Sequence, residues 1–242
     1  MSLPVAILAG GLATRLRPLT ERVPKILLDI AGRPFAEHQV ELLKRGGISR
    51  VVYCLGYLGE QVRDALGDGS RWQMTFSYVF DGERLLGTGG ALRRALPQLG
   101  DAFFVMYGDS YLECDLAEIE GSFRASGKAG LMTVFRNDNR WDRSNVRYEG
   151  GHILRYDKRA SDPAMHHIDY GLGILTPGAF AAVDDSGSAA GAPLDLAVVY
   201  QQLIATDSLA GYEVQERFYE IGSHEGLEEL RTKLEARARM TQ

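Results

Sequence analysis

The sequence predicts an α/β protein with a doubly wound, mostly parallel sheet and helices on both faces. Two observations carry this prediction. Apolar strand-like runs alternate four times with amphipathic, glycine-bounded segments between residues 4 and 109, which is the pattern of repeated strand–helix crossovers. The first run, PVAILAG, is apolar throughout, as is typical of a strand buried on both faces of a parallel sheet.

The elements of the first half follow in order. A proline near the start, apolar residues at three- and four-residue spacing, and Gly46-Gly47 at the end predict a helix over 34–45. Glycine also closes a helix predicted over 59–69, and a glycine cluster opens one over 89–99. Strands are predicted for residues 4–10, 50–56, 74–80 and 101–109.

The second half is less regular and predicts a small β-rich lobe. Residues 145–158 read as a hairpin that turns at Gly150-Gly151. Residues 184–193 are small and polar and predict a loop. Ser223 and the acidic residues after it predict the start of a C-terminal helix over 223–240. The remaining predicted elements are strands over 130–136 and 167–177, a helix over 193–207, and two short strands within 212–222.

The strand order also predicts where a ligand would bind. Gly10-Gly11 and Gly108-Asp109 each follow a predicted strand directly. Ligands of such sheets bind beyond the carboxyl ends of the strands. We therefore expect these two segments to line one crevice.

The composition of the 242 residues limits the functional classes. A hydrophobic fraction of 45% and a charged fraction of 24% are those of an ordinary globular protein. The net charge of −5 argues against general binding of nucleic acid, which needs a basic surface. Cys54 and Cys114 lack metal-ligand spacing and predict reduced thiols. No apolar stretch is long enough for a membrane span or a signal peptide, so a cytoplasmic location is expected.

The segment after the first strand carries the most specific signal. Glycines at a strand end let backbone N–H groups face a phosphate, and an arginine adds a forked, permanently charged donor. Here Gly10 and Gly11 are followed by Thr14, Arg15 and, after Pro24, Lys25. The segment lacks the P-loop pattern GxxxxGK[ST] and the dinucleotide pattern GxGxxG.

The string GGxxTRLRPLT followed by PK resembles the signature of the sugar-1-phosphate nucleotidylyltransferases, also called NDP-sugar pyrophosphorylases. The resemblance covers the whole chain and implies a Rossmann-like fold. It also implies that this loop wraps the triphosphate of a nucleoside triphosphate, with Arg15 and Lys25 as the catalytic charges. Leu8, Ala9, Gly10, Gly11 and Thr14 would then bind the nucleotide. Ala13 stands where the family usually has glycine.

Two further motifs fit the same family. LLGTGGA at 85–91 resembles its base-binding loop, in which Gly87, Thr88 and Gly89 would lie near the nucleobase. YGDS ends the fourth strand, and the resemblance implies that Asp109 binds Mg²⁺, a cation that prefers carboxylate and phosphate oxygens. Mg²⁺ is thus the expected cofactor.

The resemblance also assigns residues of the second half, on looser matches. FYEIGS places Glu220 where the family has a second metal aspartate. A glutamate is one methylene longer, so direct or water-mediated contact with the metal stays open. Lys158, after Asp157, corresponds loosely to a lysine that holds the sugar phosphate. Four further residues are expected to bind the sugar phosphate: Asn145, Asp169, Tyr170 and Gly171.

We expect a short member of the family with one nucleotidyltransferase domain over 1–242. Its nucleotide-binding half would cover about 1–125, its sugar-binding half about 126–220, and its C-terminal helix 223–239. No hexapeptide repeat of the β-helix that many relatives carry is present. The short motifs YGDS, SNV, YDK and EIG most resemble those of guanylyltransferases of heptose 1-phosphate, which serve polysaccharide biosynthesis. The expected substrates are therefore GTP and a heptose or hexose 1-phosphate.

Two other functions stay open from the sequence. A nucleotidyltransferase with a non-sugar acceptor, such as phosphocholine, would have the same loop and metal residues. A non-catalytic nucleotide-binding regulatory module is supported only by Glu220 in place of aspartate. Neither nucleic acid nor a membrane is expected as a partner, and a homodimer is compatible with the sequence.

Overall fold

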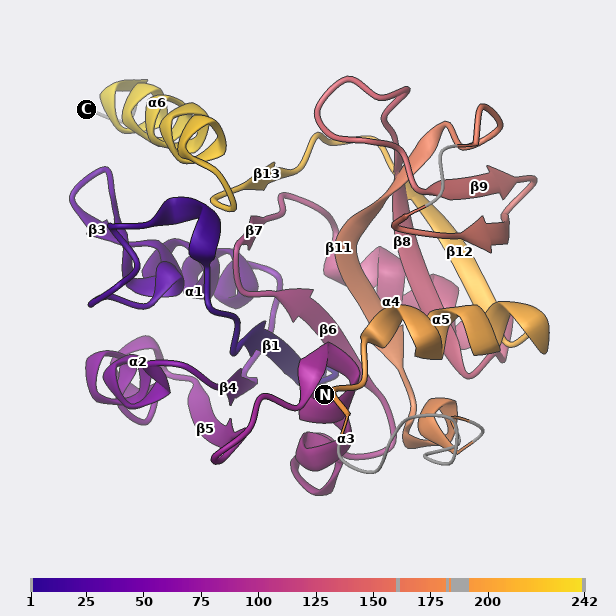
Figure 1. Cartoon of the computed structure of the whole chain (residues 1–242), viewed down its shortest axis with the longest axis horizontal. Helices are drawn as coiled ribbons and strands as arrows, with labels where there is room; N and C mark the ends of the chain where they lie inside the picture. The colour runs from indigo at the N-terminus through magenta and orange to yellow at the C-terminus, as the bar shows by residue number, and fades with distance from the viewer. Residues whose placement is uncertain (1, 160–161, 182, 184–191, 241–242) are drawn as a thin grey trace.

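The computed structural model describes residues 2–159, 162–181, 183 and 192–240 (Figure 1). The predicted loop over 184–193 therefore lies, up to residue 191, outside the described residues. Within the described ranges, no helix is long and apolar enough to cross a membrane.

Four parallel strands form the half of the sheet that the N-terminal sequence builds. Their order is β6-β1-β4-β5, and β1 pairs in parallel with both β4 and β6. The bounds are β1 Val5–Ala9, β4 Arg50–Leu55, β5 Thr75–Phe80 and β6 Phe103–Tyr107. The doubly wound α/β prediction is confirmed for this half, and all four strands end at the same sheet edge.

The second half extends the sheet beyond β6 with mixed pairing. β11 (His167–Leu175) runs antiparallel to β6 and to β8 (Gly130–Arg136), and β12 (Leu209–Val214) pairs in parallel with β8. The predicted hairpin is confirmed as β9 (Val146–Glu149) and β10 (His152–Tyr156). Its turn lies at Gly150 and Gly151, which both have positive φ angles.

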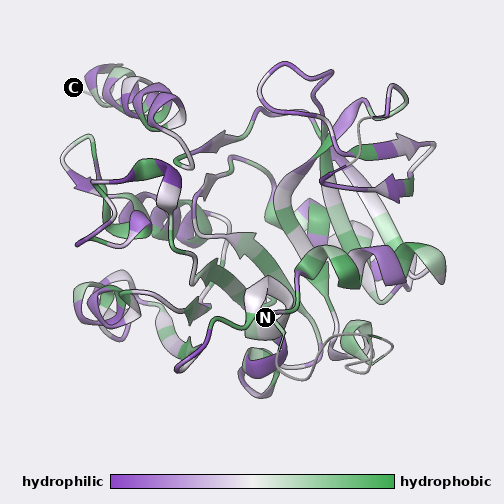
Figure 2. Cartoon of the chain, in the orientation of Figure 1, coloured by the Kyte–Doolittle hydropathy of each residue, from purple (hydrophilic) through white to green (hydrophobic). Residues whose placement is uncertain are grey.

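Two apolar cores lie on opposite faces of the sheet because successive strand residues point to opposite sides. In β1, Val5 and Ile7 join one core, whereas Ala6 and Leu8 join the other. Both sets are buried, which explains why the run is apolar without alternation. Figure 2 shows the apolar strands between the helices, whose polar residues lie on the outside.

Helices cover both cores. The first core receives apolar residues of α1 (Phe35–Arg45), α2 (Gly59–Leu66), α4 (Leu116–Ser126) and α6 (His224–Met240). The second core receives those of α3 (Gly87–Leu99) and α5 (Leu196–Ala205). The observed bounds of α1, α3, α5 and α6 lie within three residues of the predicted ends, whereas α2 ends at Leu66 because Gly67 has a φ angle of 63°.

Some elements differ from the prediction. α4 is missing from the predicted order, although Asp115 caps its first turn by accepting hydrogen bonds from the N–H groups of Ala117 and Glu118. Its buried residues Leu116, Ile119 and Phe123 have helical spacing, but Gly121 lowers the helix propensity of the segment. Two small antiparallel pairings were also not predicted: β2 (Asp29–Ile30) with β3 (Arg33–Pro34), and β7 (Ser110–Tyr111) with β13 (Tyr219–Glu220). The strand β13 itself lies in the region 212–222, where two short strands were predicted.

Candidate active site

The glycine-rich loop after β1 is tightly folded. One turn of 3₁₀ helix, Thr14–Leu16, follows Ala13, whose φ of 47° and ψ of 42° are left-handed. This conformation favours glycine, which gives a physical reason why glycine is usual at this position. The Ala13 carbonyl accepts hydrogen bonds from Leu16 N and from the Thr20 hydroxyl. The loop is therefore held by its own contacts, and Arg15 projects from its exposed side.

A cavity of about 250 Å³ lies beyond the carboxyl ends of the four parallel strands. Gly10-Gly11 and Gly108-Asp109 both line it, so the predicted shared crevice is confirmed. We call it the nucleotide-side cavity. Of the residues expected to bind nucleotide or metal or to act in catalysis, the following line it: Leu8, Ala9, Gly10, Gly11, Lys25, Gly87, Thr88 and Asp109. Thr14, Arg15, Gly89 and Glu220 do not.

The LGTGG segment is the first turn of α3 rather than a separate loop. Its glycines admit the chain before α5: the N–H groups of Gly89 and Gly90 donate to the Leu194 carbonyl, and a Cβ at Gly87 would lie 2.4 Å from that oxygen. Gly87 also has a φ of 75°. These glycines are thus required for packing against Leu194, whatever they do for a bound base.

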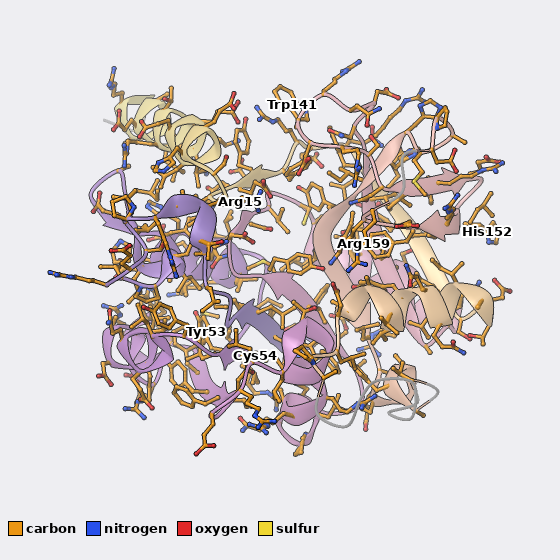
Figure 3. All side chains as sticks on the ribbon, viewed as in Figure 1. Arg15, Tyr53, Cys54, Trp141, His152 and Arg159 are labelled. Atoms are coloured by element: carbon orange, nitrogen blue, oxygen red, sulfur yellow. The ribbon has the colours of Figure 1, made fainter. Side chains whose placement is uncertain are left out.

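Asp109 and Glu220 are brought together by the β7–β13 ribbon. Glu220 pairs with Ser110, and the N–H of Ile221 donates to the Asp109 carbonyl at 2.9 Å. A Cβ atom at Gly222 would lie 3.5 Å from both Asp109 Oδ2 and Glu220 Oε1, and 3.4 Å from a guanidinium nitrogen of Arg15. Two carboxylates and an arginine therefore converge on one point. Figure 3 places Arg15 near the strand that Figure 1 labels β13.

The charges at this point suit a divalent cation. Burial raises the pKa of Glu220, and the negative charges of Asp109 and Asp142 raise it further, against the opposing charges of Arg15 and Lys25. Lys25 Nζ lies 2.6 Å from Asp109 Oδ2. The described residues contain no cluster of three or more metal-ligating side chains. Two carboxylates fit Mg²⁺, which takes its other ligands from phosphates and water.

A second cavity, of about 360 Å³, adjoins the first and is called here the acceptor-side cavity. Asp109 and Tyr107 line both cavities, so they form the boundary between them. The residues predicted for the sugar phosphate, the metal and catalysis that line it are Arg15, Asp109, Asn145, Lys158, Asp169, Tyr170, Gly171 and Glu220.

Asp169 is held in the acceptor-side cavity by a dense set of contacts. Its carboxylate accepts hydrogen bonds from the Tyr156 hydroxyl and from Gly171 N, and burial raises its pKa. Asn145 Oδ1 accepts from Asp169 N. Gly171 has a φ of 91°, and a Cβ there would lie 2.9 Å from Ser110 Oγ. The Tyr170 ring packs edge-on against Phe218, within the first apolar core.

Lys158 links the two cavities through Asp195. Lys158 Nζ lies 3.3 Å from Asp195 Oδ1, which also accepts from the Thr88 hydroxyl at 3.3 Å and from Ala197 N at 2.9 Å. Asp195 thus caps α5 while it contacts a residue of each cavity. The opposing Lys158 charge and these hydrogen bonds outweigh burial and lower the pKa of Asp195.

Sequence reasoning missed four charged residues at the site. Asp81 lines the nucleotide-side cavity, Asp142 and Arg143 line the acceptor-side cavity, and Asp195 joins them. Asp81 directly follows a predicted strand, so the rule that selected Asp109 could have selected it. No comparable signal marks Asp142, Arg143 or Asp195, because loops far apart in the sequence bring them here.

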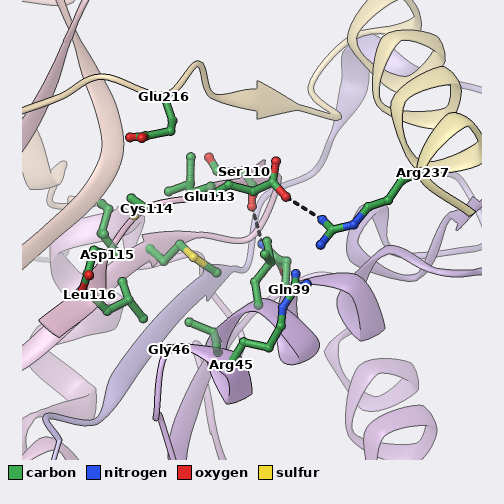
Figure 4. A pocket seen from close by; sticks show the side chains of 15 residues that line it. Gln39, Arg45, Gly46, Ser110, Glu113, Cys114, Asp115, Leu116, Glu216 and Arg237 are labelled. Carbon is green, nitrogen blue, oxygen red and sulfur yellow. Dashed lines mark hydrogen bonds and ion pairs between the residues drawn. The ribbon is translucent and has the colours of Figure 1, made fainter. Parts of the chain in front are cut away.

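A third cavity, of about 460 Å³, lies outside this site between α1, the chain before α4, and α6 (Figure 4). Arg237 of α6 reaches Glu113 at 2.7 Å across it. Gln39 of α1 donates to the Ser110 carbonyl at 2.8 Å. Within the described part of the chain, none of the predicted site residues lines this cavity.

The comparison with protein families agrees with this geometry. The model of the family described as nucleotidyl transferase matches residues 5–236. Among solved structures, a Bacillus anthracis protein assigned as a glucose-1-phosphate thymidylyltransferase superposes with a TM-score of 0.85 at 20% identity, covering 96% of this chain and 94% of that one. HddC from Yersinia pseudotuberculosis, solved in complex with GMP-PN, has a TM-score of 0.77 at 23% identity. The superposition covers 96% of this chain and 99% of HddC. These structures share the α/β fold.

Curated relatives match parts of the chain. An N-acetylmuramate alpha-1-phosphate uridylyltransferase of Neisseria meningitidis is 41% identical over 45% of this chain and 48% of its own length. The mannose-1-phosphate guanylyltransferase catalytic subunit beta of Xenopus tropicalis is 32% identical over 71% of this chain and 49% of its own length. The low-salt glycan biosynthesis nucleotidyltransferase Agl11 of Haloferax volcanii is 30% identical over 74% of this chain and 50% of its own length. The chain spans about half the length of these relatives.

Proposed function

The chain belongs to the nucleotidyl transferase family, and we propose that it transfers a nucleotidyl group from a nucleoside triphosphate to a sugar 1-phosphate, releasing pyrophosphate. The observation that carries the proposal is the position of Asp109 on the boundary of two adjoining cavities. A reaction that joins two phosphorylated substrates needs two such cavities with the charged groups between them. Two of the curated relatives are named for nucleotidyl transfer to a sugar 1-phosphate, and a third is named as a nucleotidyltransferase of glycan biosynthesis, which supports the same proposal.

In the proposed reaction, an oxygen of the sugar phosphate attacks the α-phosphorus in line with the leaving group. A new phosphorus–oxygen bond forms, the bond to the β-phosphate oxygen breaks, and pyrophosphate leaves with the bonding electrons. The protein contributes positioning and charge neutralisation. No general base is needed, because a phosphate monoester with a second pKa of about 6 is already mostly ionised near neutral pH.

On the nucleotide side, the glycine-rich loop offers backbone N–H groups to the triphosphate. Lys25 lies beside Asp109 at the boundary and would neutralise charge on the departing pyrophosphate. Arg15 lines the acceptor-side cavity near Glu220 and would also neutralise charge on the same phosphates. Asp109 and Glu220 would hold Mg²⁺, which when bound supplies positive charge to the phosphate oxygens.

On the acceptor side, Lys158 is placed to hold the attacking phosphate, and Arg143 adds a second cation to the same cavity. Asp169 and Asn145 carry the oxygens that suit sugar hydroxyl groups, and Gly171 leaves space for the ring. This set of hydroxyl-binding groups favours a sugar 1-phosphate. Participation in nucleotide-sugar and polysaccharide biosynthesis follows as part of the proposal.

A substrate screen tests the proposed function. The purified chain is incubated with each of four NTPs and with hexose 1-phosphates, heptose 1-phosphates or phosphocholine, and pyrophosphate is measured with Mg²⁺ or with EDTA. We expect release with one or more sugar 1-phosphates, and none with EDTA. Pyrophosphate release with phosphocholine but with no sugar 1-phosphate would mean that the acceptor is not a sugar. No pyrophosphate release with any pair of substrates would contradict a catalytic function.

A further inference from the structure

A half-exposed tryptophan beside the acceptor-side cavity has no role in the proposed reaction. Trp141 lies between β8 and β9, in residues 137–144, which we call the acceptor loop. It is 47% exposed, belongs to neither apolar core and lines neither cavity of the site. The next two residues, Asp142 and Arg143, both line the acceptor-side cavity. Because no core holds the Trp141 ring, its position depends on a specific contact.

The acceptor loop is closed by its own hydrogen bonds. The buried side chain of Asn137 donates to the Asp142 carbonyl at 2.6 Å and accepts from Trp141 N at 3.3 Å. Ser144, which is also buried, donates its N–H to Asn139 Oδ1 at 2.8 Å, and its hydroxyl oxygen accepts from Asn139 N at 3.0 Å. These contacts make the loop a compact unit, so the position of Trp141 fixes that of Asp142.

Arg217, in the chain that leads into β13, contacts the Trp141 ring. Its guanidinium carbon lies 3.3 Å from the centroid of the Trp141 ring and 4.5 Å from that of the Tyr219 ring. Its Nη2 lies 2.5 Å from Glu229 Oε2 of α6. A guanidinium is attracted to the face of an aromatic ring, more strongly where water is excluded. Figure 3 shows Trp141 in the acceptor loop, near the chain that leads into β13.

This stack joins two groups of residues that the proposed reaction must align. On one side, the acceptor loop supplies Asp142 and Arg143 to the cavity. The Arg143 side chain also donates to the carbonyl of Lys158, the residue placed to hold the attacking phosphate. On the other side, Arg217 lies three residues before Glu220, which would hold Mg²⁺. The stack therefore connects the binding of the acceptor phosphate with the position of a metal carboxylate.

We propose that Trp141 and Arg217 form a latch that positions the acceptor loop and β13 relative to each other. The effect of the latch on the sugar phosphate rests on the proposed function. Both are positioning residues, because neither lines a cavity and each acts through its neighbours. Opening the latch frees the acceptor loop, so the attacking phosphate binds less tightly and is less well aligned with the α-phosphorus.

Steady-state kinetics of Trp141→Ala, Trp141→Phe, Arg217→Ala and the double alanine variant test the effect on the acceptor. One arginine–aromatic stack corresponds to about a 2- to 30-fold change in an equilibrium constant, depending on exposure. We expect the KM for the sugar 1-phosphate to rise about 3- to 10-fold in Trp141→Ala, and the KM for the NTP to change less than twofold. Trp141→Phe keeps a ring face and should restore most of the wild-type value. The double variant should be no worse than Arg217→Ala, because both substitutions remove the same contact.

Hydrogen–deuterium exchange tests the latch without any need for activity. The N–H of Ile221 donates to the Asp109 carbonyl at 2.9 Å, so exchange in a peptide covering 216–222 reports how firmly β13 is held. We expect this peptide to exchange at least threefold faster in Trp141→Ala than in the wild type, although the substitution lies in a different part of the sequence.

Trp72→Ala is the matched control for Trp141→Ala. The guanidinium carbon of Arg71 lies 3.7 Å from the centroid of the Trp72 ring, and neither residue lines a cavity of the site. Removing this second arginine–tryptophan stack should leave both KM values and the exchange of the 216–222 peptide unchanged.

Three results would overturn the latch: unchanged exchange of the 216–222 peptide in Trp141→Ala, an unchanged KM for the sugar 1-phosphate in that variant, or equal effects of Trp72→Ala. Each of these leaves the proposed function intact if the wild type releases pyrophosphate. Faster exchange in Trp141→Ala, together with a wild type that releases no pyrophosphate from any substrate pair, would overturn the proposed function and support the latch.

Discussion

The side chains of Arg15 and Lys25 both lie beside the Asp109–Glu220 pair. Lys25 Nζ lies 2.6 Å from Asp109 Oδ2, and an Arg15 nitrogen and Glu220 Oε1 lie around the same point at Gly222. We predict that Arg15→Ala and Lys25→Ala each lower kcat by about 10²–10³, the usual effect of removing one preorganised donor. Steady-state pyrophosphate release measures this.

Arg22→Ala is the matched control for that prediction. Arg22 lies on the same loop, is exposed and lines neither cavity. If Arg22→Ala loses as much activity as the other two variants, the general positive charge of the loop matters and the specific positions do not.

Single residues also show what a sequence can indicate. Asp109 was found from its place at a strand end, and it does lie on the edge shared by four parallel strands. Position 13 holds alanine where the family resemblance leads one to expect glycine. The φ of 47° at Ala13 shows that the backbone there has the conformation that glycine favours. The partners of Asp109 could not be found in this way, since Glu220 reaches it through a ribbon of two-residue strands.

At the scale of elements, α6 supports the strand that carries Glu220. Gly226 in its first turn lies against β13: a Cβ there would be 2.3 Å from the Glu220 carbonyl oxygen. We predict that Gly226→Ala displaces Glu220 and lowers kcat at least tenfold, since small misplacements of catalytic groups have large effects. The same variant should raise the Mg²⁺ concentration needed for half-maximal activity.

Gly121→Ala in α4 provides the control for Gly226→Ala. A Cβ at Gly121 meets nothing within 4 Å, so this change should stabilise the helix by about 0.5–1 kcal/mol and leave kcat unchanged. Equal kcat in the two variants would refute the role given to Gly226, and thermal unfolding measures the stability of both.

Glu113 ties α6 to the chain before α4. It lies 2.6 Å from Lys233 and 2.7 Å from Arg237. Burial raises the pKa of Glu113, but the hydrogen bonds and charges of these two residues outweigh it, so the pKa falls below the ordinary 4.5. The ionised form is thus favoured in the folded state, and its contribution is present above about pH 4.5 and lost as the pH falls further.

We therefore predict that Glu113→Gln lowers the free energy of unfolding by about 1 kcal/mol near pH 7, as expected for two partly exposed ion pairs. The difference from wild type should shrink as the pH falls below 4.5. Urea unfolding at a series of pH values checks this. A difference that stays constant down to pH 3 would mean that packing, and not charge, holds the helix here.

For the whole molecule, Asp195 joins the two halves of the site. It contacts Lys158 on the acceptor side and Thr88 on the nucleotide side. Asp195→Asn keeps an oxygen for Thr88 and for capping α5 but removes the charge opposite Lys158. We predict that the KM for the sugar 1-phosphate rises about 2- to 5-fold, in keeping with one exposed ion pair, and that the KM for the NTP changes less than twofold.

Asp115→Asn serves as the control, because Asp115 caps α4 in the same way without contact to Lys158. It should leave both KM values unchanged. A lower KM for the sugar phosphate in Asp195→Asn would contradict the prediction, because it would mean that Asp195 competes with the substrate for Lys158.

The sequence by itself determined the strands and helices of the first half, the crevice at their ends and the family. These follow from local apolar periodicity, glycine positions and one motif, each of which is readable over a few residues. It missed α4, in which Gly121 lowers the local helix propensity and whose apolar face is stabilised by packing in the first core.

Only the tertiary structure decided how the predicted charges meet and which further charges join them. The β7–β13 ribbon places Glu220 beside Asp109. The packing of α5 against α3 places Asp195 beside Lys158. It also decided that the glycines of LGTGG admit Leu194 and that Asp81 faces the nucleotide-side cavity. Each of these contacts joins residues distant in the chain, and their distances are set by burial and pairing that no local pattern encodes.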